Sequence, residues 1–133
     1  MAYDPNNRFY RIIHGEIKLP EDEIVLDAPH ALAFVYDKPQ APVHVLVIPK
    51  GSYESLSDFT QRASPAEILG FWQAVDEVTK KIKIDKTGYR LITNCGADAE
   101  QRMPHFHVHI IGGAPLGPLW PNKRKSLDEG CNP

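Results

Sequence analysis

The sequence predicts an α+β fold: an antiparallel sheet of about five strands with one main helix and a short N-terminal helix. Two observations predict it. Short runs rich in β-branched and aromatic residues follow one another between proline-containing turns, and a single long segment has the period of a helix. The chain has 133 residues, enough for one core that needs no disulfides or metal. We therefore expect a single domain over residues 1–133.

Five segments have the composition of strands, with many valine, isoleucine and aromatic residues. They cover residues 23–26, 31–36, 43–48, 89–93 and 105–111. Short turns containing proline separate the first three, so we expect consecutive antiparallel neighbours. A loop over residues 94–104 joins the last two, and Gly112 and Gly113 end the fifth strand.

The main helix is predicted to begin after Ser64, which can cap it. Pro65 suits the first helical position, and Glu67 can close a capping box with Ser64. Apolar residues then recur at three- to four-residue spacing, which gives a stripe that packs on the sheet. The stripe comprises Ile68, Trp72, Val75, Val78 or Thr79, and Ile82. Gly88 ends the helical region.

The two ends of the chain differ from this core. Residues 1–7 are predicted to form a polar arm, and Phe9, Ile12 and Ile13 follow at a spacing that favours a short helix. Residues from about 122 to 133 are charged, and we expect a mobile tail there.

Charge and cysteine content limit the possible partners. The formal net charge is −2, so no global positive field attracts nucleic acid or an anionic membrane. No apolar stretch of the sequence approaches the roughly 20 residues that span a bilayer. The cysteines, Cys95 and Cys131, are far apart and suggest neither a disulfide framework nor a cysteine zinc site. We expect a cytoplasmic protein without a nucleic-acid or membrane partner.

Three histidines alternate along the predicted fifth strand. Side chains of a strand point to alternate faces, so His105, His107 and His109 share one face and the apolar residues between them point into the core. Successive imidazoles would lie roughly 6 to 7 Å apart. Neutral imidazoles need hydrogen-bond partners and protonated ones repel each other, so such a row indicates a functional site rather than packing.

Three further polar residues are candidates for the same site. His44 lies on the predicted third strand and can approach the histidine row from a neighbouring strand. Asn94 directly follows the fourth strand, where an amide can meet an oxyanion. Gln101 lies four residues before His105.

The segment from Gln101 to Ile111, QRMPHFHVHII, is similar to the His-x-His-x-His-x-x motif of the histidine triad (HIT) family. The likeness covers most of the chain, from residues 9–17 through 39–44 and 47–50 to Trp120 and Pro121. It is greatest to the nucleotide-binding, phosphoramidase-like branch. The resemblance implies an α+β fold, a homodimer, and hydrolysis of nucleotidyl bonds at the α-phosphorus of a nucleoside phosphoramidate or a dinucleoside polyphosphate.

The resemblance also implies a role for each histidine. His107 would be the nucleophile that forms a covalent nucleotidyl intermediate, which water then resolves. His105 and His109 would contact phosphate or orient His107. His44 would act behind these groups or on the side of the leaving group.

Other positions match the nucleotide contacts of the family. Asn94 and Gln101 match phosphate-contacting positions, and a purine base is favoured. The apolar wall that packs against the base corresponds to Phe9, Ile12, Phe34 and Leu46. The resemblance implies no resident metal or cofactor, although Mg²⁺ can enter complexed to the substrate.

Two positions depart from the branch pattern. Arg102 stands where the branch has a serine that serves the leaving group, so we hypothesise a more anionic leaving group such as a nucleotide or polyphosphate. The ribose-binding acid of the branch is replaced by Tyr36, with Asp37 one residue later. Ribose recognition would then involve this region in another way.

Two other functions fit the same residues. His-x-His on a strand can present two ligands to zinc, so the protein could be a metallohydrolase in which the histidines activate water. It could also be a nucleotide-binding regulator with little turnover. Metal content and the effect of replacing His107 separate these functions.

Overall fold

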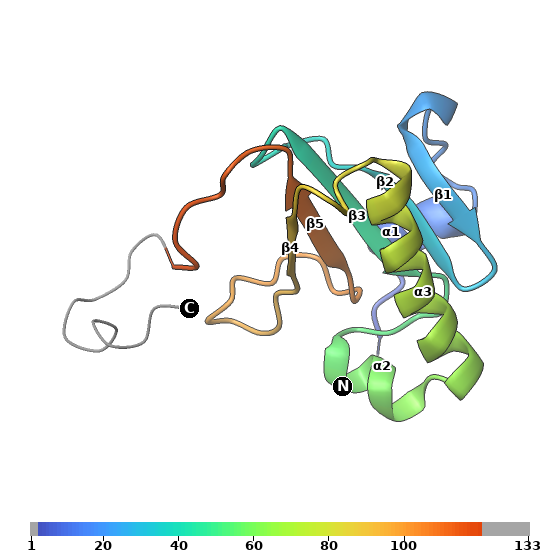
Figure 1. The fold of residues 1–133 in the computed structure, drawn as a ribbon. Coiled ribbons are helices and arrows are strands. Elements are labelled where there is room, and N and C mark those ends of the chain that lie inside the picture. Colours follow the sequence, from blue (N-terminus) through green and yellow to red (C-terminus); the bar gives the residue numbers. More distant parts are fainter. Residues whose placement is uncertain (1–2, 121–133) are drawn as a thin grey trace.

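The structure is a computed structural model that describes residues 3–120 (Figure 1). Its elements in order are α1 (Arg8–Ile13), the 3₁₀ turn η1 (Glu21–Glu23), β1 (Ile24–Ala28), β2 (Ala31–Val35), β3 (Val43–Pro49), α2 (Leu56–Arg62), α3 (Pro65–Lys81), β4 (Tyr89–Ile92) and β5 (Val108–Gly112). The tail predicted for residues 122–133 and the first two residues of the predicted arm lie outside the described range. Within that range, no helix is long and apolar enough to cross a bilayer.

The five strands form one antiparallel sheet in the order β1-β2-β3-β5-β4. Short turns connect the first three strands, which therefore pair in sequence. Strand β5 pairs with the other edge of β3, so that His44 lies opposite Ile111 and Leu46 lies opposite His109. The predicted five-stranded antiparallel sheet is confirmed, and the strands that carry His44 and His109 are interior ones.

Helix α3 begins with the predicted capping box. Ser64 Oγ accepts the N–H of Glu67, and the Glu67 carboxylate accepts the N–H of Ser64, both at 3.1 Å. The helix ends at Lys81 rather than near Gly88, because turns follow from residue 82. The predicted apolar stripe is wrong at Trp72, which is 37% exposed.

Phe71 takes the place of Trp72 in the core and is fully buried. Both aromatic residues fit the three-to-four spacing to within one position, so the spacing alone could not choose between them. The helix is rotated so that Phe71, Val75 and Val78 face the sheet.

Each face of the sheet has its own apolar core. Helix α3 packs on β1, β2 and β3 and covers one face. On the other face, Phe9 and Ile12 of α1 pack with Phe34 and Leu46 of the sheet. Figure 1 shows α3 in front of the sheet and α1 behind it. The sheet is therefore a layer between the two helices, and the α1 side is the one that carries the histidines.

Strand β5 begins at Val108, so the strand predicted over residues 105–111 is wrong in its first part. The N–H of Phe106 donates to Tyr53 O at 2.7 Å, and the N–H of His105 bonds within its own loop. These groups therefore do not join the ladder with β3. The alternation of faces still holds, because Phe106 lies in the core on the α3 side.

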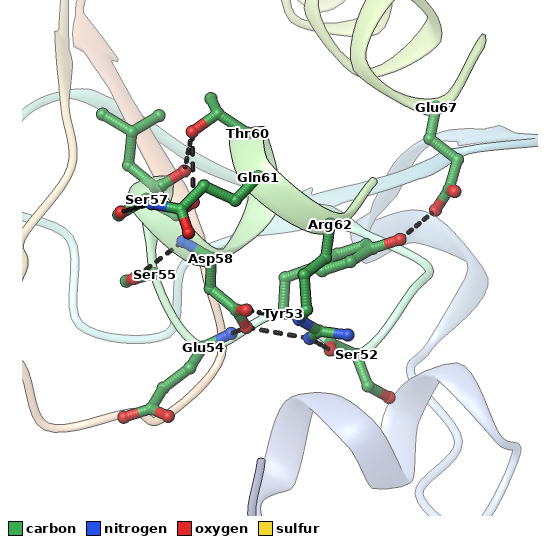
Figure 2. A network of polar contacts seen from close by, with 11 residues as sticks. Ser52, Tyr53, Glu54, Ser55, Ser57, Asp58, Thr60, Gln61, Arg62 and Glu67 are labelled. Atoms are coloured by element: carbon green, nitrogen blue, oxygen red, sulfur yellow. Dashed lines mark hydrogen bonds and ion pairs between the residues drawn. The ribbon is translucent and has the colours of Figure 1, made fainter. Parts of the chain in front are cut away.

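A polar network ties the segment after β3 to α2, which the sequence patterns did not predict, and to α3 (Figure 2). The Tyr53 hydroxyl donates to the Glu67 carboxylate at 2.6 Å. The guanidinium of Arg62 lies 5.0 Å from the centre of the Tyr53 ring and forms an ion pair with Asp58. Burial, together with the nearby Glu67 carboxylate, raises the pKa of Tyr53 to about 12. The network fixes Tyr53. Its carbonyl in turn accepts the N–H of Phe106, the residue between His105 and His107 in the sequence.

Candidate active site

Four histidines gather on the α1 side of the sheet. His44 comes from β3, His109 from β5, and His105 and His107 from the segment that leads into β5. His105 is 0% exposed, His44 6% and His107 7%, and His109 is partly exposed. The ring centres of His107 and His109 are 5.1 Å apart, as are those of His44 and His109. The structure thus brings together all four histidines that the sequence predicted for the site.

The hydrogen bond between His44 and His109 has a direction that the backbone determines. The N–H of Gln40 donates to His44 Nδ1 at 3.0 Å, so this nitrogen is an acceptor. A neutral imidazole has a single N–H, which in His44 must be on Nε2, and it donates to His109 Nδ1 at 2.9 Å. The proton of neutral His109 is then on its Nε2, where it is free to donate to a ligand.

His105 is held at both ring nitrogens. Its Nε2 lies 3.0 Å from Pro49 O, which can only accept, so Nε2 carries the proton. Its Nδ1 is therefore an acceptor, and the Tyr3 hydroxyl donates to it at 2.5 Å. The ring of His105 is fixed in one tautomer and one orientation.

His107 has one nitrogen engaged and one available. Its Nδ1–H donates to His105 O at 2.7 Å, so the neutral ring has its lone pair on Nε2. Burial lowers the pKa of His107, which keeps this lone pair unprotonated at neutral pH. An imidazole held at one nitrogen and unprotonated at the other is arranged to act as a nucleophile.

Burial also lowers the pKa values of the other three histidines. The pKa of His105 falls to about 4, and the nearby His107 adds to the effect of burial. The pKa of His109 also falls to about 4, with contributions from His107 and His44. Burial lowers the pKa of His44. At neutral pH the cluster therefore consists of uncharged rings that donate and accept in fixed directions.

The four residues predicted to form a base wall lie beside the histidines. The ring of Phe9 packs edge-on against His107 with the centres 5.2 Å apart, and against Phe34 at 5.8 Å. Ile12 and Leu46 belong to the same cluster. All four are at most 8% exposed. They form the core on the α1 side, and their contact with a base stays a prediction.

Gln101 braces the loop that precedes His105. Its Nε2 donates to Glu54 O at 2.9 Å and to Met103 O at 3.1 Å, and its Oε1 accepts the N–H of Gly96 at 3.1 Å. The side-chain amide is thus occupied by backbone groups. The predicted contact of Gln101 with phosphate would have to replace one of these bonds.

Sequence reasoning missed two hydroxyl groups of the site. Tyr3 bonds to His105, and the Thr93 hydroxyl donates to His107 O at 2.8 Å. The predicted phosphate contact Asn94 directly follows Thr93 in the chain and is half-buried. Nothing in the local sequence indicates either hydroxyl, because both partners lie in distant segments.

Residues 18–116 match the family model described as the HIT domain. The chain belongs to the HIT family. An uncharacterised 13.2 kDa HIT-like protein of Azospirillum brasilense is 50% identical over 118 residues, 89% of this chain and 94% of that protein. The purine nucleoside phosphoramidase of Escherichia coli strain K12 is 36% identical over 116 residues, 86% of this chain and 93% of the enzyme. The solved structure of a HIT family hydrolase from Legionella pneumophila superposes with a TM-score of 0.76 at 28% identity, covering 89% of this chain and all of that one (100%).

The two departures from the HIT branch pattern occupy different places. The Tyr36 ring packs against the site, with its centre 4.5 Å from that of His44 and 5.6 Å from that of His109. Asp37 points outward to Arg8, at 3.6 Å, with half of its side chain exposed. Of the two residues considered for ribose, only Tyr36 contacts the histidines.

Arg102, which replaces the serine of the HIT branch, has an exposed side chain. It is 88% exposed, and its partner is the equally exposed Glu100 at 3.8 Å. This ion pair is weak because solvent screens it. Arg102 is therefore available to a charged ligand at the end of the loop that Gln101 braces.

The hydrogen bonds of the histidines bear on the metallohydrolase alternative. Over residues 3–120, no three His, Cys, Asp or Glu side chains are placed to hold a metal ion together. Both ring nitrogens of His44 and of His105 already take part in hydrogen bonds. A metal would have to displace these bonds, so the donor set argues against the metallohydrolase alternative.

Proposed function

We propose that the protein hydrolyses nucleotidyl bonds with His107 Nε2 as the nucleophile. The asymmetry of the His107 ring carries this proposal: Nδ1–H is held by His105 O at 2.7 Å, and Nε2 keeps its lone pair. The likeness to the E. coli purine nucleoside phosphoramidase supports a nucleotide substrate with a purine base. In this proposal the base would lie beside the apolar residues next to the ring, of which Phe9 packs edge-on against His107.

In the first step, Nε2 of His107 attacks the α-phosphorus of a nucleoside phosphoramidate or a dinucleoside polyphosphate. A bond forms from Nε2 to phosphorus, and the bond from phosphorus to the leaving group breaks. A polyphosphate departs as an anion, and the nitrogen of a phosphoramidate takes up a proton from solvent and departs as an amine. The Nδ1–H bond to His105 O stabilises the positive charge that develops on the ring. The Nε2–H of His109 can donate to a non-bridging oxygen of the phosphorus.

In the second step, water attacks the phosphorus of the nucleotidyl-histidine. The bond from phosphorus to Nε2 breaks, the attacking water gives up a proton to solvent, a nucleoside monophosphate leaves, and His107 regains its lone pair. This chemistry needs no resident metal, and any Mg²⁺ would enter bound to the substrate phosphates.

Turnover assays test the proposed function. The wild-type protein should release adenosine monophosphate from adenosine 5′-phosphoramidate or a diadenosine polyphosphate, and His107→Ala should not. Turnover of the phosphoramidate should survive a chelator, and added Zn²⁺ should not restore His107→Ala. The matched control is His14→Ala, which removes an exposed histidine at the end of α1. Activity that a chelator abolishes and zinc restores would support the metallohydrolase instead.

Arg102 supports a preference for an anionic leaving group. A polyphosphate departs as an anion, whereas an amine must acquire a proton, and the guanidinium can neutralise the polyphosphate. The exposed Arg102–Glu100 pair can exchange for a phosphate with little loss. Arg102→Ser should lower kcat/KM for a diadenosine polyphosphate relative to the phosphoramidate. If the ratio of kcat/KM for the polyphosphate to kcat/KM for the phosphoramidate were equal in the variant and the wild type, this preference would be contradicted.

The edge of the sheet supports a homodimer. Strand β4 is an edge strand, and its residues Tyr89 and Leu91 are 40% and 41% exposed. By register they face the α3 side, where Leu69 is 60% exposed and Trp72 37%. An edge strand with exposed apolar neighbours is suited to pairing with a second copy. Light scattering should give a dimer for the wild type and a monomer for Leu91→Arg, and a monomeric wild type would contradict the proposal.

A further inference from the structure

We propose that Tyr3 is a positioning residue for the histidine site. Its hydroxyl fixes the ring of His105, and His105 in turn holds His107 through its carbonyl. The inference rests on the proposed function of His107. Tyr3 lies outside residues 18–116, the part of the chain that matches the HIT domain model. The N-terminal segment of this chain would thus complete a site that the matched domain alone leaves open.

The contact between Tyr3 and His105 is close and well oriented. The hydroxyl lies 2.5 Å from His105 Nδ1, and the two rings meet edge to face with their centres 5.5 Å apart. The residues are 102 positions apart in the sequence. Since His105 is 0% exposed, its Nδ1 has no access to water and depends on the hydroxyl of Tyr3 for a partner.

Asn7 sets the direction of this hydrogen bond. Its Oδ1 accepts the N–H of Tyr10 at 2.9 Å as the N-cap of α1, so its Nδ2 faces the other way. Nδ2 donates to the Tyr3 oxygen at 2.9 Å and to Asp4 O at 2.7 Å. The Tyr3 oxygen is therefore an acceptor toward Asn7, which leaves its hydrogen for His105.

The protonation states of Tyr3 and His105 fit this direction. Burial raises the pKa of Tyr3, so the hydroxyl remains a donor at neutral pH. Burial lowers the pKa of His105 to about 4, so Nδ1 remains an acceptor. Both groups are therefore in the states that the hydrogen bond requires.

The bond at Nδ1 acts on His107 through the backbone of His105. With Tyr3 at Nδ1 and Pro49 O at Nε2, the His105 ring cannot rotate or exchange its tautomer without breaking a buried hydrogen bond. The carbonyl of the same residue accepts the Nδ1–H of His107 at 2.7 Å. The orientation of His105 thus sets the direction of the His107 lone pair.

Tyr3→Phe tests the proposal because it removes only the hydroxyl and keeps the ring against His105. We expect kcat to fall about tenfold with KM within about twofold of the wild type, because one positioning bond is lost and no ligand contact. The matched control is Tyr10→Phe, on helix α1 just after the N-terminal arm, whose ring stacks on His14 with the centres 3.9 Å apart. An unchanged kcat, or a raised KM with unchanged kcat, would overturn the proposal.

Nitrogen NMR of the histidine rings gives a readout that does not depend on turnover. In the wild type, His105 should be an Nε2–H tautomer with Nδ1 in the range of a hydrogen-bonded acceptor. In Tyr3→Phe, the Nδ1 signal should move toward that of a free acceptor, and in Tyr10→Phe it should not. An unchanged Nδ1 signal would refute the role of Tyr3. A wild-type protein that shows the expected signals and no turnover would refute the proposed function while supporting the contact.

Asn7→Asp provides a second test in which Tyr3 itself is not substituted. The new carboxylate keeps the acceptor that caps α1, but it loses the N–H donor and competes with His105 for the Tyr3 hydroxyl. It should therefore reproduce the fall in kcat and the movement of the Nδ1 signal. A folded Asn7→Asp variant with wild-type kcat and spectrum would overturn the proposal.

Discussion

The segment from His105 to Ile110 has two faces with opposite requirements. On the α3 side, Phe106 is 1% exposed and stacks on Phe59 with the ring centres 5.1 Å apart, and Ile110 is 0% exposed. These residues need only shape and burial. On the α1 side, the imidazoles of His105 and His107 are buried and that of His109 is partly exposed, and each needs polar partners, which come from β3, β5 and the N-terminal segment. Packing on the apolar face holds the backbone of the segment in place. The histidines on the polar face are therefore fixed in the orientations that the proposed chemistry needs.

The largest effect should come from removing the lone pair of His107. His107→Asn keeps a donor for His105 O but has no nucleophilic nitrogen, so turnover should fall by at least about 10⁴-fold. The free energy of unfolding, measured with urea, should change by less than about 1 kcal/mol. Retained turnover would mean that the polar face does not carry out the chemistry. A large loss of stability would mean that the two faces do not divide the tasks as described.

The opposite face should respond in the opposite way. Phe106→Ala leaves a cavity beside Phe59 and Phe71 and should reduce the free energy of unfolding by about 3–5 kcal/mol. The folded fraction should keep kcat within a few-fold of the wild type at low temperature. Urea titration and activity per folded molecule measure the two effects. A small stability change with a large loss of kcat would contradict the view that the apolar face contributes stability and the polar face the chemistry.

Acid should lower the free energy of unfolding through the buried histidines of the polar face. The pKa of His105 is about 4 in the folded protein against 6.5 in the unfolded chain, so the unfolded chain binds more protons between these values. The stability contributed by neutral His105 is therefore complete above pH 6.5 and is lost as the pH falls through about 4. This group alone should reduce the free energy of unfolding by roughly 2 kcal/mol between about pH 7.5 and about pH 5.

Urea titrations at the two pH values measure this effect. The comparison variant is His105→Gln, which removes the titrating ring. Its stability should fall less steeply with acid than that of the wild type. Equal slopes in the variant and the wild type would contradict the assignment of a depressed pKa to His105.

Much of this architecture could be predicted from short-range patterns. The capping box of Ser64 and Glu67 and the alternation of faces from His105 onward depend on contacts within a few residues. The rotation of α3 could not be predicted, because Phe71 and Trp72 fit the same helical period. The start of β5 was missed because Phe106 bonds to Tyr53 O, a group that no local pattern indicates.

The candidate site was predictable in its residue types and less so in its connections. The motif indicated His107 and its neighbours, and the strand register brought His44 to His109 as expected. The contact from Tyr3 to His105 could not be predicted, since 102 residues separate the two. The backbone partners of Gln101 were equally hidden, because an amide in a loop has the same sequence signal whether it binds phosphate or braces a turn.

The smallest of these effects should come from Gln101. Gln101→Met removes the amide that joins Gly96, Glu54 and Met103, and should cost about 1 kcal/mol of stability because the loop before His105 loosens. Thermal unfolding and steady-state kinetics together measure its role. A raised KM without any loss of stability would instead make Gln101 a phosphate ligand, as the family resemblance implies.

The most direct test of the account is capture of the intermediate on His107. Wild-type protein mixed with an adenosine phosphoramidate and quenched in the first turnover should carry one adenylyl group, and peptide mass spectrometry should locate it on His107. An adduct on another histidine, or an unmodified His107 while product accumulates at a rate that requires an intermediate, would contradict the account.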